Sequence, residues 1–308
     1  MTTLGVIVFP NTTVLPLHVG IEKGLFAREG LGIEITVTPT STYQITGLYA
    51  GKYPIAIGAF DNIVAYQEGQ GAVVLEGEPD LFAFMGVAQM NLQLVVQPDI
   101  RSYADLKGKT FAVDAPSSGF VFVLRRMLEL GGLGPDDYAL VAVGTRRWDS
   151  MKAGEHAGAL RTDSYMAGEL SQGLKVLESS IDVLPGYQSA VGSARRSWAA
   201  ANRDTLVAFI RAYVDCIDWI FEPGNRQEAA NLLAQNRPGM SDEAARKAVA
   251  QLVAPHEGLT RGAKISPEGV QTVIDLRNRY GEPRKKMKPP EDYIDLSYYD
   301  AAMRSRRW

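Results

Sequence analysis

The stretch "LHVGIEKGLFAREGLGIEITVTPT", Leu17 to Thr40, decides the fold class. Before it, "LGVIVF" (Leu4–Phe9) is a short apolar run rich in β-branched residues, and the "PNTT" that follows predicts a buried strand ending in a turn. Leu17–Arg28 has the pattern of a helix that Gly30 stops, and "IEITVTPT" (Ile33–Thr40) alternates as a strand does. A strand, a loop, a helix and a second strand predict a parallel pair with a right-handed crossover.

Composition and charge bound the class of protein. The 308 residues suffice for one large domain or two of ordinary size, and 46% hydrophobic with 22% charged residues is usual for a globular protein. A net charge of −3 gives no electrostatic reason to expect nucleic acid or an anionic membrane as partner. Because no apolar run approaches the roughly 20 residues of a membrane helix, we expect no direct membrane insertion. The single cysteine, Cys216, excludes an intrachain disulfide and a cysteine-cluster metal site.

Further strands and helices alternate along the first two thirds of the chain, which argues for an α/β architecture with parallel sheet. The predicted strands are "PIAIGA" (54–59), "AVVLEG" (72–77), "LFAFMGVA" (81–88), "LQLVVQ" (92–97), "TFAVDA" (110–115) and "YALVAVG" (138–144). From about Ser197 the pattern becomes helical, and Ser241 is the clearest cap. The tail Arg284–Trp308, rich in Lys, Arg, Pro and Tyr, is expected to be irregular chain on the surface.

The segment "GIEKGLFAREGLGIEI" (Gly20–Ile35) resembles the opening of the periplasmic solute-binding proteins grouped with alkanesulfonate, taurine, nitrate and thiamine-pyrimidine binders. "SYADLKGKTFAVDAPSSG" (Ser102–Gly119) is similar to the segment where that family enters its second lobe. "GEHAGAL" (Gly154–Leu160) resembles a glycine–acidic–alanine–alanine pattern, and "LSYYDAAM" (Leu296–Met303) resembles the family's usual ending. The likeness covers nearly the whole chain and concerns the fold, not the ligand.

This resemblance implies a two-lobed, periplasmic-binding-protein-like (type II) α/β fold with a cleft between the lobes. Lobe one would take residues 1–88 and 190–308, and lobe two residues 89–189, with crossings near 86–91 and 185–193. In open α/β sheets, ligands bind outside the carboxyl ends of the strands. The turns that follow the strands are therefore expected to face the cleft.

Polar residues occupy several of these strand-to-helix turns. Backbone N–H groups and hydroxyls at a helix N-terminus suit a carboxylate or sulfonate, and the Asp61 carboxylate can accept a hydrogen bond from a ligand amine or hydroxyl. The same residues would also serve as ordinary helix caps, so capping alone is the alternative. The ligand-binding candidates at these turns are Asn11, Thr12, Thr40, Ser41, Thr42, Asp61, Asn62, Ser117, Ser118 and Gly119.

Four more candidates lie in lobe two and at the second crossing. Arg146 follows a predicted strand and can clamp an anion, the alternative being a solvated surface side chain. Arg161 ends a strand where the family often has an apolar residue or proline, so its charge should be paired with Asp163 or bound to ligand. Tyr187 and Gln188 are expected to supply an aromatic wall and an amide contact, or else to pack the hinge.

The sequence contains no recognisable catalytic constellation. It has no G-x-S-x-G elbow, no H-E-x-x-H and no Walker loop. The histidines are scattered, and Cys216 falls in the apolar pattern of a long helix, where a small buried hydrophobe is expected. We therefore predict no catalytic residue, no metal site and no cofactor.

Two functions remain open at this point. The first is a solute-binding protein that closes on a small anionic organic ligand, a carboxylate or sulfonate and possibly aromatic, for the membrane subunits of an ABC importer. The second is a cytoplasmic enzyme or ligand sensor on the same scaffold, because fold does not fix function. A removed signal would place the protein in the periplasm or on a lipid anchor, whereas a native start at Met1 would place it in the cytoplasm.

Overall fold

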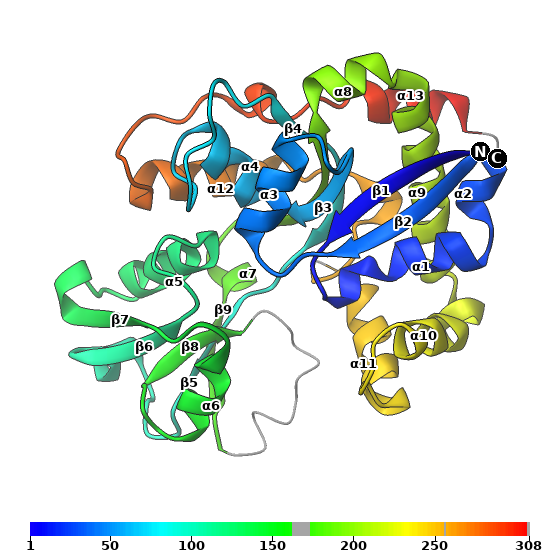
Figure 1. The fold of residues 1–308 in the computed structure, drawn as a ribbon. Helices are drawn as coiled ribbons and strands as arrows, with labels where there is room; N and C mark the ends of the chain where they lie inside the picture. The colour runs from blue at the N-terminus through cyan, green and yellow to red at the C-terminus, as the bar shows by residue number, and fades with distance from the viewer. Residues whose placement is uncertain (162–172, 256, 307–308) are drawn as a thin grey trace.

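The structure is a computed structural model that describes residues 1–161, 173–255 and 257–306. In this part of the chain, two five-stranded mixed sheets are each flanked by helices and form two lobes (Figure 1). This confirms the predicted two-lobed α/β fold. The division at residues 88/89 and 189/190 stays a proposal, and the lobes are defined below by their sheets.

Lobe one is built on a sheet with the strand order β2-β1-β3-β10-β4. The strands are β1 (Thr2–Val8), β2 (Leu31–Val37), β3 (Ile55–Ala59), β4 (Leu81–Gln89) and β10 (Gln188–Arg195). β1 pairs in parallel with β2, Leu4 lying opposite Ile33, so the parallel pair predicted from the first forty residues is confirmed. β10 returns from lobe two and runs antiparallel between β3 and β4.

The helix predicted over Leu17–Arg28 is in fact two helices, α1 (Leu15–Glu22) and α2 (Leu25–Arg28). Gly24 separates them because its φ of 65° is left-handed, a conformation that glycine adopts without steric cost. The break turns α2 so that both helices pack against the same long helix, α9 (Arg203–Phe221).

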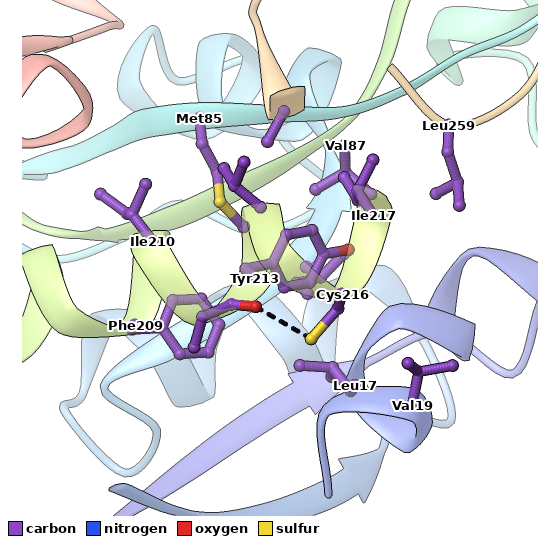
Figure 2. Close-up of a cluster of buried hydrophobic side chains, with 14 of the residues drawn as sticks. Leu17, Val19, Met85, Val87, Phe209, Ile210, Tyr213, Cys216, Ile217 and Leu259 are labelled. Atoms are coloured by element: carbon purple, nitrogen blue, oxygen red, sulfur yellow. Dashed lines mark hydrogen bonds between the residues drawn. The ribbon is translucent and has the colours of Figure 1, made fainter. Parts of the chain in front are cut away.

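The core of lobe one lies between the sheet, α1 and α9 (Figure 2). Phe209 and Tyr213 of α9 stack with ring centroids 5.9 Å apart, and Met85 and Val87 of β4 belong to the same cluster. Cys216 is fully buried there and its Sγ donates to the Ala212 carbonyl at 3.0 Å, so its predicted role as a small buried hydrophobe is confirmed.

Lobe two is built on a second sheet with the order β7-β6-β8-β5-β9. Its strands are β5 (Gln93–Val96), β6 (Lys109–Val113), β7 (Tyr138–Ala142), β8 (Gly158–Arg161) and β9 (Lys175–Ser179). β6 pairs in parallel with β7 and β8, while β5 runs antiparallel to β8 and β9.

The remaining helices are α3 (Ser41–Tyr49), α4 (Phe60–Gln67), α5 (Gly119–Leu130), α6 (Arg147–Lys152), α7 (Ser180–Val183), α8 (Arg196–Ala201), α10 (Arg226–Gln235), α11 (Asp242–Leu252), α12 (Pro267–Tyr280) and α13 (Ser297–Ser305). Most of them pack around the two sheets, while α10 and α11 lie beyond α1 (Figure 1). The cap predicted at Ser241 is confirmed, since its hydroxyl accepts from the Ala244 N–H at 3.2 Å. No helix in the described ranges is long and apolar enough to cross a membrane.

Two predicted elements are wrong. Residues 72–77 form no strand: they belong to the loop between α4 and β4, and Val74 is 82% exposed. β-branched residues favour a strand only where a neighbouring strand pairs with them. The C-terminal tail is not irregular throughout, because α13 lies in it and buries Tyr298 and Tyr299 against lobe one.

Helix α12 joins the two lobes. It packs on α4 and β10 of lobe one and on α5 of lobe two. The rings of Phe122 of α5 and Tyr280 of α12 pack at a tilt of 37° with their centroids 6.0 Å apart, and one hydrophobic cluster includes residues of both sheets. The lobes are therefore in contact beside the two crossings, not only through them.

Candidate functional site

A cavity of about 480 Å³ lies between the lobes. Its lining comes from the turns after β1, β3 and β6, and from the crossings at Met90 and at Tyr187–Ala190. These turns stand at the carboxyl ends of their strands, where α/β proteins hold their ligands. The cavity is therefore the candidate ligand site.

Eight of the residues predicted from the sequence come together around this cavity. The lining members of that set are Asn11, Ser41, Asp61, Asn62, Ser117, Ser118, Gly119 and Tyr187. Their role in holding a ligand stays a prediction, but they are now neighbours in space.

Three predicted residues at the same turns lie outside the lining. Thr12 is 6% exposed, and Thr13 takes its place at the cavity. Thr40 caps α3, since its Oγ1 accepts from the Tyr43 N–H at 3.1 Å. Thr42 accepts from the Tyr66 hydroxyl at 3.2 Å. For Thr40, helix capping accounts for the residue without a ligand.

Neither predicted arginine lines the cavity. The Arg146 side chain is 70% exposed, and its Nη2 lies 3.9 Å from Glu155 Oε2. It is therefore a solvated surface side chain, the alternative to an anion clamp. Arg161 is 5% exposed, and its Nε donates to Gln93 Oε1 at 3.1 Å on the neighbouring strand β5. Asp163, its expected partner, lies outside the described residues.

Gln188 packs the hinge. It is fully buried, and its amide nitrogen donates to the carbonyls of Ala88 at 3.2 Å and Ala190 at 2.9 Å. Its Oε1 accepts from the Ser266 N–H at 2.9 Å, at the start of α12. One side chain thus ties β4, β10 and α12 together.

Asp61 forms a buried ion pair with Arg277, a residue that the sequence analysis did not select. Arg277 Nε lies 2.7 Å from Asp61 Oδ1, and Nη2 lies 2.5 Å from Oδ2, so the pair is bidentate. The two side chains are 7% and 3% exposed. Burial acts to lower the pKa of Arg277, but the Asp61 carboxylate outweighs it and holds that pKa above its usual value.

The Asp61 carboxylate also lies against the first residue of α5. A Cβ placed on Gly119 would stand 2.3 Å from Asp61 Cγ. Position 119 therefore has to be glycine for lobe two to approach lobe one this closely. An acidic side chain of lobe one thus occupies space beside the helix N-terminus that the sequence assigned to an anionic ligand.

Two hydroxyl groups at the cavity have no hydrogen-bond partner among the described residues. They are Ser118 Oγ at the start of α5 and Tyr187 Oη at the second crossing. Tyr187 is 3% exposed, and burial raises its pKa well above the usual value, the Asp61 carboxylate adding to the rise. A buried hydroxyl without a partner is costly, and a bound ligand group would satisfy it.

Sequence reasoning missed several lining residues besides Arg277. They are Phe9, Pro10, Tyr66, Gln70, Met90, Asp114, Phe120 and Ser189. Asp114 had a usable signal, because it is the first residue after β6. The aromatic and apolar members had none, since a ring that lines a cavity and a ring that fills a core have the same sequence pattern.

The histidines show no catalytic arrangement in the described ranges. Burial lowers the pKa of His18 on α1, and His156 Nδ1 lies 2.9 Å from Thr110 Oγ1. His256 lies outside the described residues. No group of three or more His, Cys, Asp or Glu in this part of the chain could hold a metal ion.

Comparison with models of protein families identifies the family of this chain. Residues 1–234 match the model of the NMT1-like family, which is well over half of the chain. The chain belongs to the NMT1-like family. The matched range contains both sheets and every predicted site residue.

A curated relative of this NMT1-like protein is named formylaminopyrimidine-binding protein and comes from Halalkalibacterium halodurans. The two are 27% identical over an alignment of 252 positions, which covers 74% of this chain and 68% of the relative.

Two solved structures show how widely this fold is shared. The periplasmic nitrate-binding protein of Synechocystis PCC 6803 is 13% identical with a TM-score of 0.77, over 99% of this chain and 89% of that one. The periplasmic aliphatic sulphonate binding protein of Escherichia coli is 18% identical with a TM-score of 0.74, over 97% of this chain and 99% of that one. These similarities establish the fold, and each protein named is a binding protein.

Proposed function

We propose that this protein binds a small organic solute between its lobes and delivers it to the membrane subunits of an ABC importer. The observation that carries the proposal is the cavity, which both lobes line at the carboxyl ends of their strands. Contacts from both sides stabilise the closed form only when the solute is present, which is how a two-lobed receptor couples binding to closure. The names of the relative and of the two structures support the same role. Such a role belongs outside the cytoplasm, which we include in the proposal.

The cavity fits a small molecule with an apolar body and a few polar groups. Rings of Phe9 and Tyr66 from lobe one face the space that Phe120 of lobe two also lines. A carboxylate or sulfonate, the class expected from the sequence, could use the Ser117 and Ser118 hydroxyls, but at the α5 N-terminus it would meet the Asp61 carboxylate. Such an anion would meet no unpaired Lys or Arg in the described lining, because Arg277 is its one cation and is bound to Asp61.

Calorimetric titration of the purified protein tests the proposal. The panel contains carboxylates, sulfonates, nitrate and aminopyrimidines, and small-angle scattering reports whether a bound solute changes the shape of the protein. Mass spectrometry of the recovered solute separates binding from turnover. Recovery of an intact solute is expected, and a converted product would favour an enzyme on this scaffold.

A cavity-filling variant ties binding to this site. Ala115 lines the cavity and is exposed, so Ala115→Trp should fill it without disturbing a core and weaken binding by about tenfold or more. Ala104→Trp is the matched control, because Ala104 is an exposed residue of lobe two outside the lining. Equal affinity of the Ala115→Trp variant and the wild type would remove the cavity from the proposal.

A further inference from the structure

The charges that line the cavity do not favour an anion. The described lining contains three charged side chains, Asp61, Asp114 and Arg277. Arg277 and Asp61 neutralise each other in the buried bidentate pair. The carboxylate of Asp114 is then left as the unbalanced charge, and the described wall of the cavity is net negative.

Asp114 is placed to meet a ligand. It follows β6 directly, is exposed, and its carboxylate has no hydrogen bond or ion pair with a described residue. Arg147 lines a small adjoining pocket that Asp114 also lines, and its guanidinium lies over the Trp148 ring, 5.6 Å from the centroid. A carboxylate at the mouth of a partly enclosed cavity attracts cations and disfavours anions, and the effect grows as closure removes water.

A second, independent observation points to a ligand at the same place. Tyr187 is 3% exposed and its hydroxyl has no partner in the described part of the chain, although it lines the cavity. The Tyr187 ring lies 6.1 Å from the ring of Phe120, which stands in the first turn of α5 directly after the turn that holds Asp114 and Ser118. The Ser118 hydroxyl, which also has no partner among the described residues, comes from the same β6–α5 turn as Asp114 and lines the same cavity.

We propose that Asp114, Tyr187 and Ser118 form a subsite that selects solutes with a cationic nitrogen donor, such as an amidine or a protonated amine. Asp114 accepts the charge-assisted hydrogen bond, and the two hydroxyls bind the polar atoms beside it. The Asp61–Arg277 pair behind them keeps the α5 N-terminus from serving an anion. This inference rests on the proposed function, since it concerns the charge of the solute held in that cavity.

Three probes of one shape and different charge test it: benzamidine, benzamide and benzoate. Calorimetric titration should rank benzamidine first and benzoate last, with about tenfold or more between benzamidine and benzamide. The Asp114→Asn variant should bind benzamidine about tenfold more weakly and change its affinity for benzamide far less. Asp99→Asn, at an exposed aspartate of lobe two outside the lining, is the control and should leave the ranking unchanged.

The outcomes distinguish this inference from the proposed function. Preference of the wild type for benzoate, or an equal loss of all three probes in Asp114→Asn with an unchanged melting temperature, would overturn the inference and leave solute binding intact. Absence of binding for the probes and for the whole solute panel would remove both. Tyr187→Phe adds a further check, because it should weaken benzamidine and benzamide alike without lowering the stability of the unligated protein.

Discussion

Each end of helix α5 lies beside a carboxylate–guanidinium pair, and the two pairs have opposite surroundings. At its N-terminus, Gly119 lies against the Asp61–Arg277 pair, whose side chains are 7% and 3% exposed. At its C-terminus, Glu129 binds Arg279 of α12, with Arg279 Nε 2.8 Å from Glu129 Oε2, and these side chains are 34% and 52% exposed. Both are carboxylate–guanidinium pairs with a partner on α12.

Burial makes the two pairs differ in what they control. A solvent-exposed pair contributes little to the free energy of folding, because water stabilises its two charges almost as well in the unfolded chain. A buried pair costs several kcal/mol to desolvate, so each partner depends on the other once the site is closed. The comparison predicts that losing one partner of the buried pair destabilises the protein far more than losing one partner of the exposed pair.

Loss of one partner of the buried pair should have the largest effect. Arg277→Met leaves the Asp61 carboxylate without its counter-charge and should lower the free energy of unfolding by about 3–5 kcal/mol. Urea denaturation followed by circular dichroism measures it. The double variant Asp61→Val with Arg277→Met removes both charges and should be more stable than the single variant. A single variant as stable as the wild type would show that the pair is not desolvated.

The second largest loss of stability is expected at the start of α5, where Gly119 packs against the Asp61 carboxylate. Gly119→Ala places a Cβ 2.3 Å from Asp61 Cγ, so the carboxylate or the helix has to shift, at a cost of about 1–3 kcal/mol. Thermal and urea unfolding report the loss. Gly224→Ala is the control, because a Cβ there meets nothing within 4 Å. Equal stability of the Gly119→Ala variant and the wild type would mean that the lobes separate here at no cost.

Removing a buried hydroxyl that has no partner should not lower the free energy of unfolding and can raise it. Tyr187→Phe beside the buried pair and Tyr213→Phe in the lobe-one core each delete a buried hydroxyl without a described partner. Each should leave the unligated protein as stable as the wild type or more stable by about 1 kcal/mol. A clear loss in the urea midpoint of both variants would reveal bonds to ordered water.

The smallest effect on stability is expected for Glu129, at the exposed end of α5. The Arg279 guanidinium and the Tyr280 hydroxyl lower the pKa of Glu129 from 4.5 to about 2. A lowered pKa stabilises the folded protein above the unfolded value, so this contribution is complete above pH 4.5 and is lost as the pH falls toward 2.

Glu129→Gln should therefore cost less than about 1 kcal/mol at neutral pH, and less still in high salt. The difference in melting temperature between variant and wild type should shrink as the pH falls below 4.5. A difference that stays constant down to pH 3 would contradict the assignment of the pKa to this contact.

The sequence predicted what depends on neighbouring residues along the chain. The turns holding Asn11, Ser41 and Asn62 follow β1, β2 and β3, so their convergence at one edge of the lobe-one sheet follows from parallel pairing. Ser118 follows β6 of the other sheet and reaches the same cavity through the arrangement of the two lobes. Arg277 was out of reach because its partner Asp61 lies 216 residues away, and a helix of mixed charges does not reveal which residue turns inward.

Arg146 and Arg161 are residues that the sequence selected for the site but that do not line the cavity. Both follow or end strands of lobe two, as a residue facing the cavity would, yet one points to solvent and the other to Gln93. Position along a strand sets which face a side chain leaves from, but sheet order decides what lies there. That order is a tertiary property, which a single sequence does not display.

The place of β10 has a consequence for how the protein is made. A nascent chain that has not reached Gln188 has β3 and β4 but lacks the strand that joins them. The strands of lobe two, in contrast, form one continuous stretch of chain. On the ribosome lobe two can therefore complete its sheet before lobe one, whose N-terminal strands wait for β10.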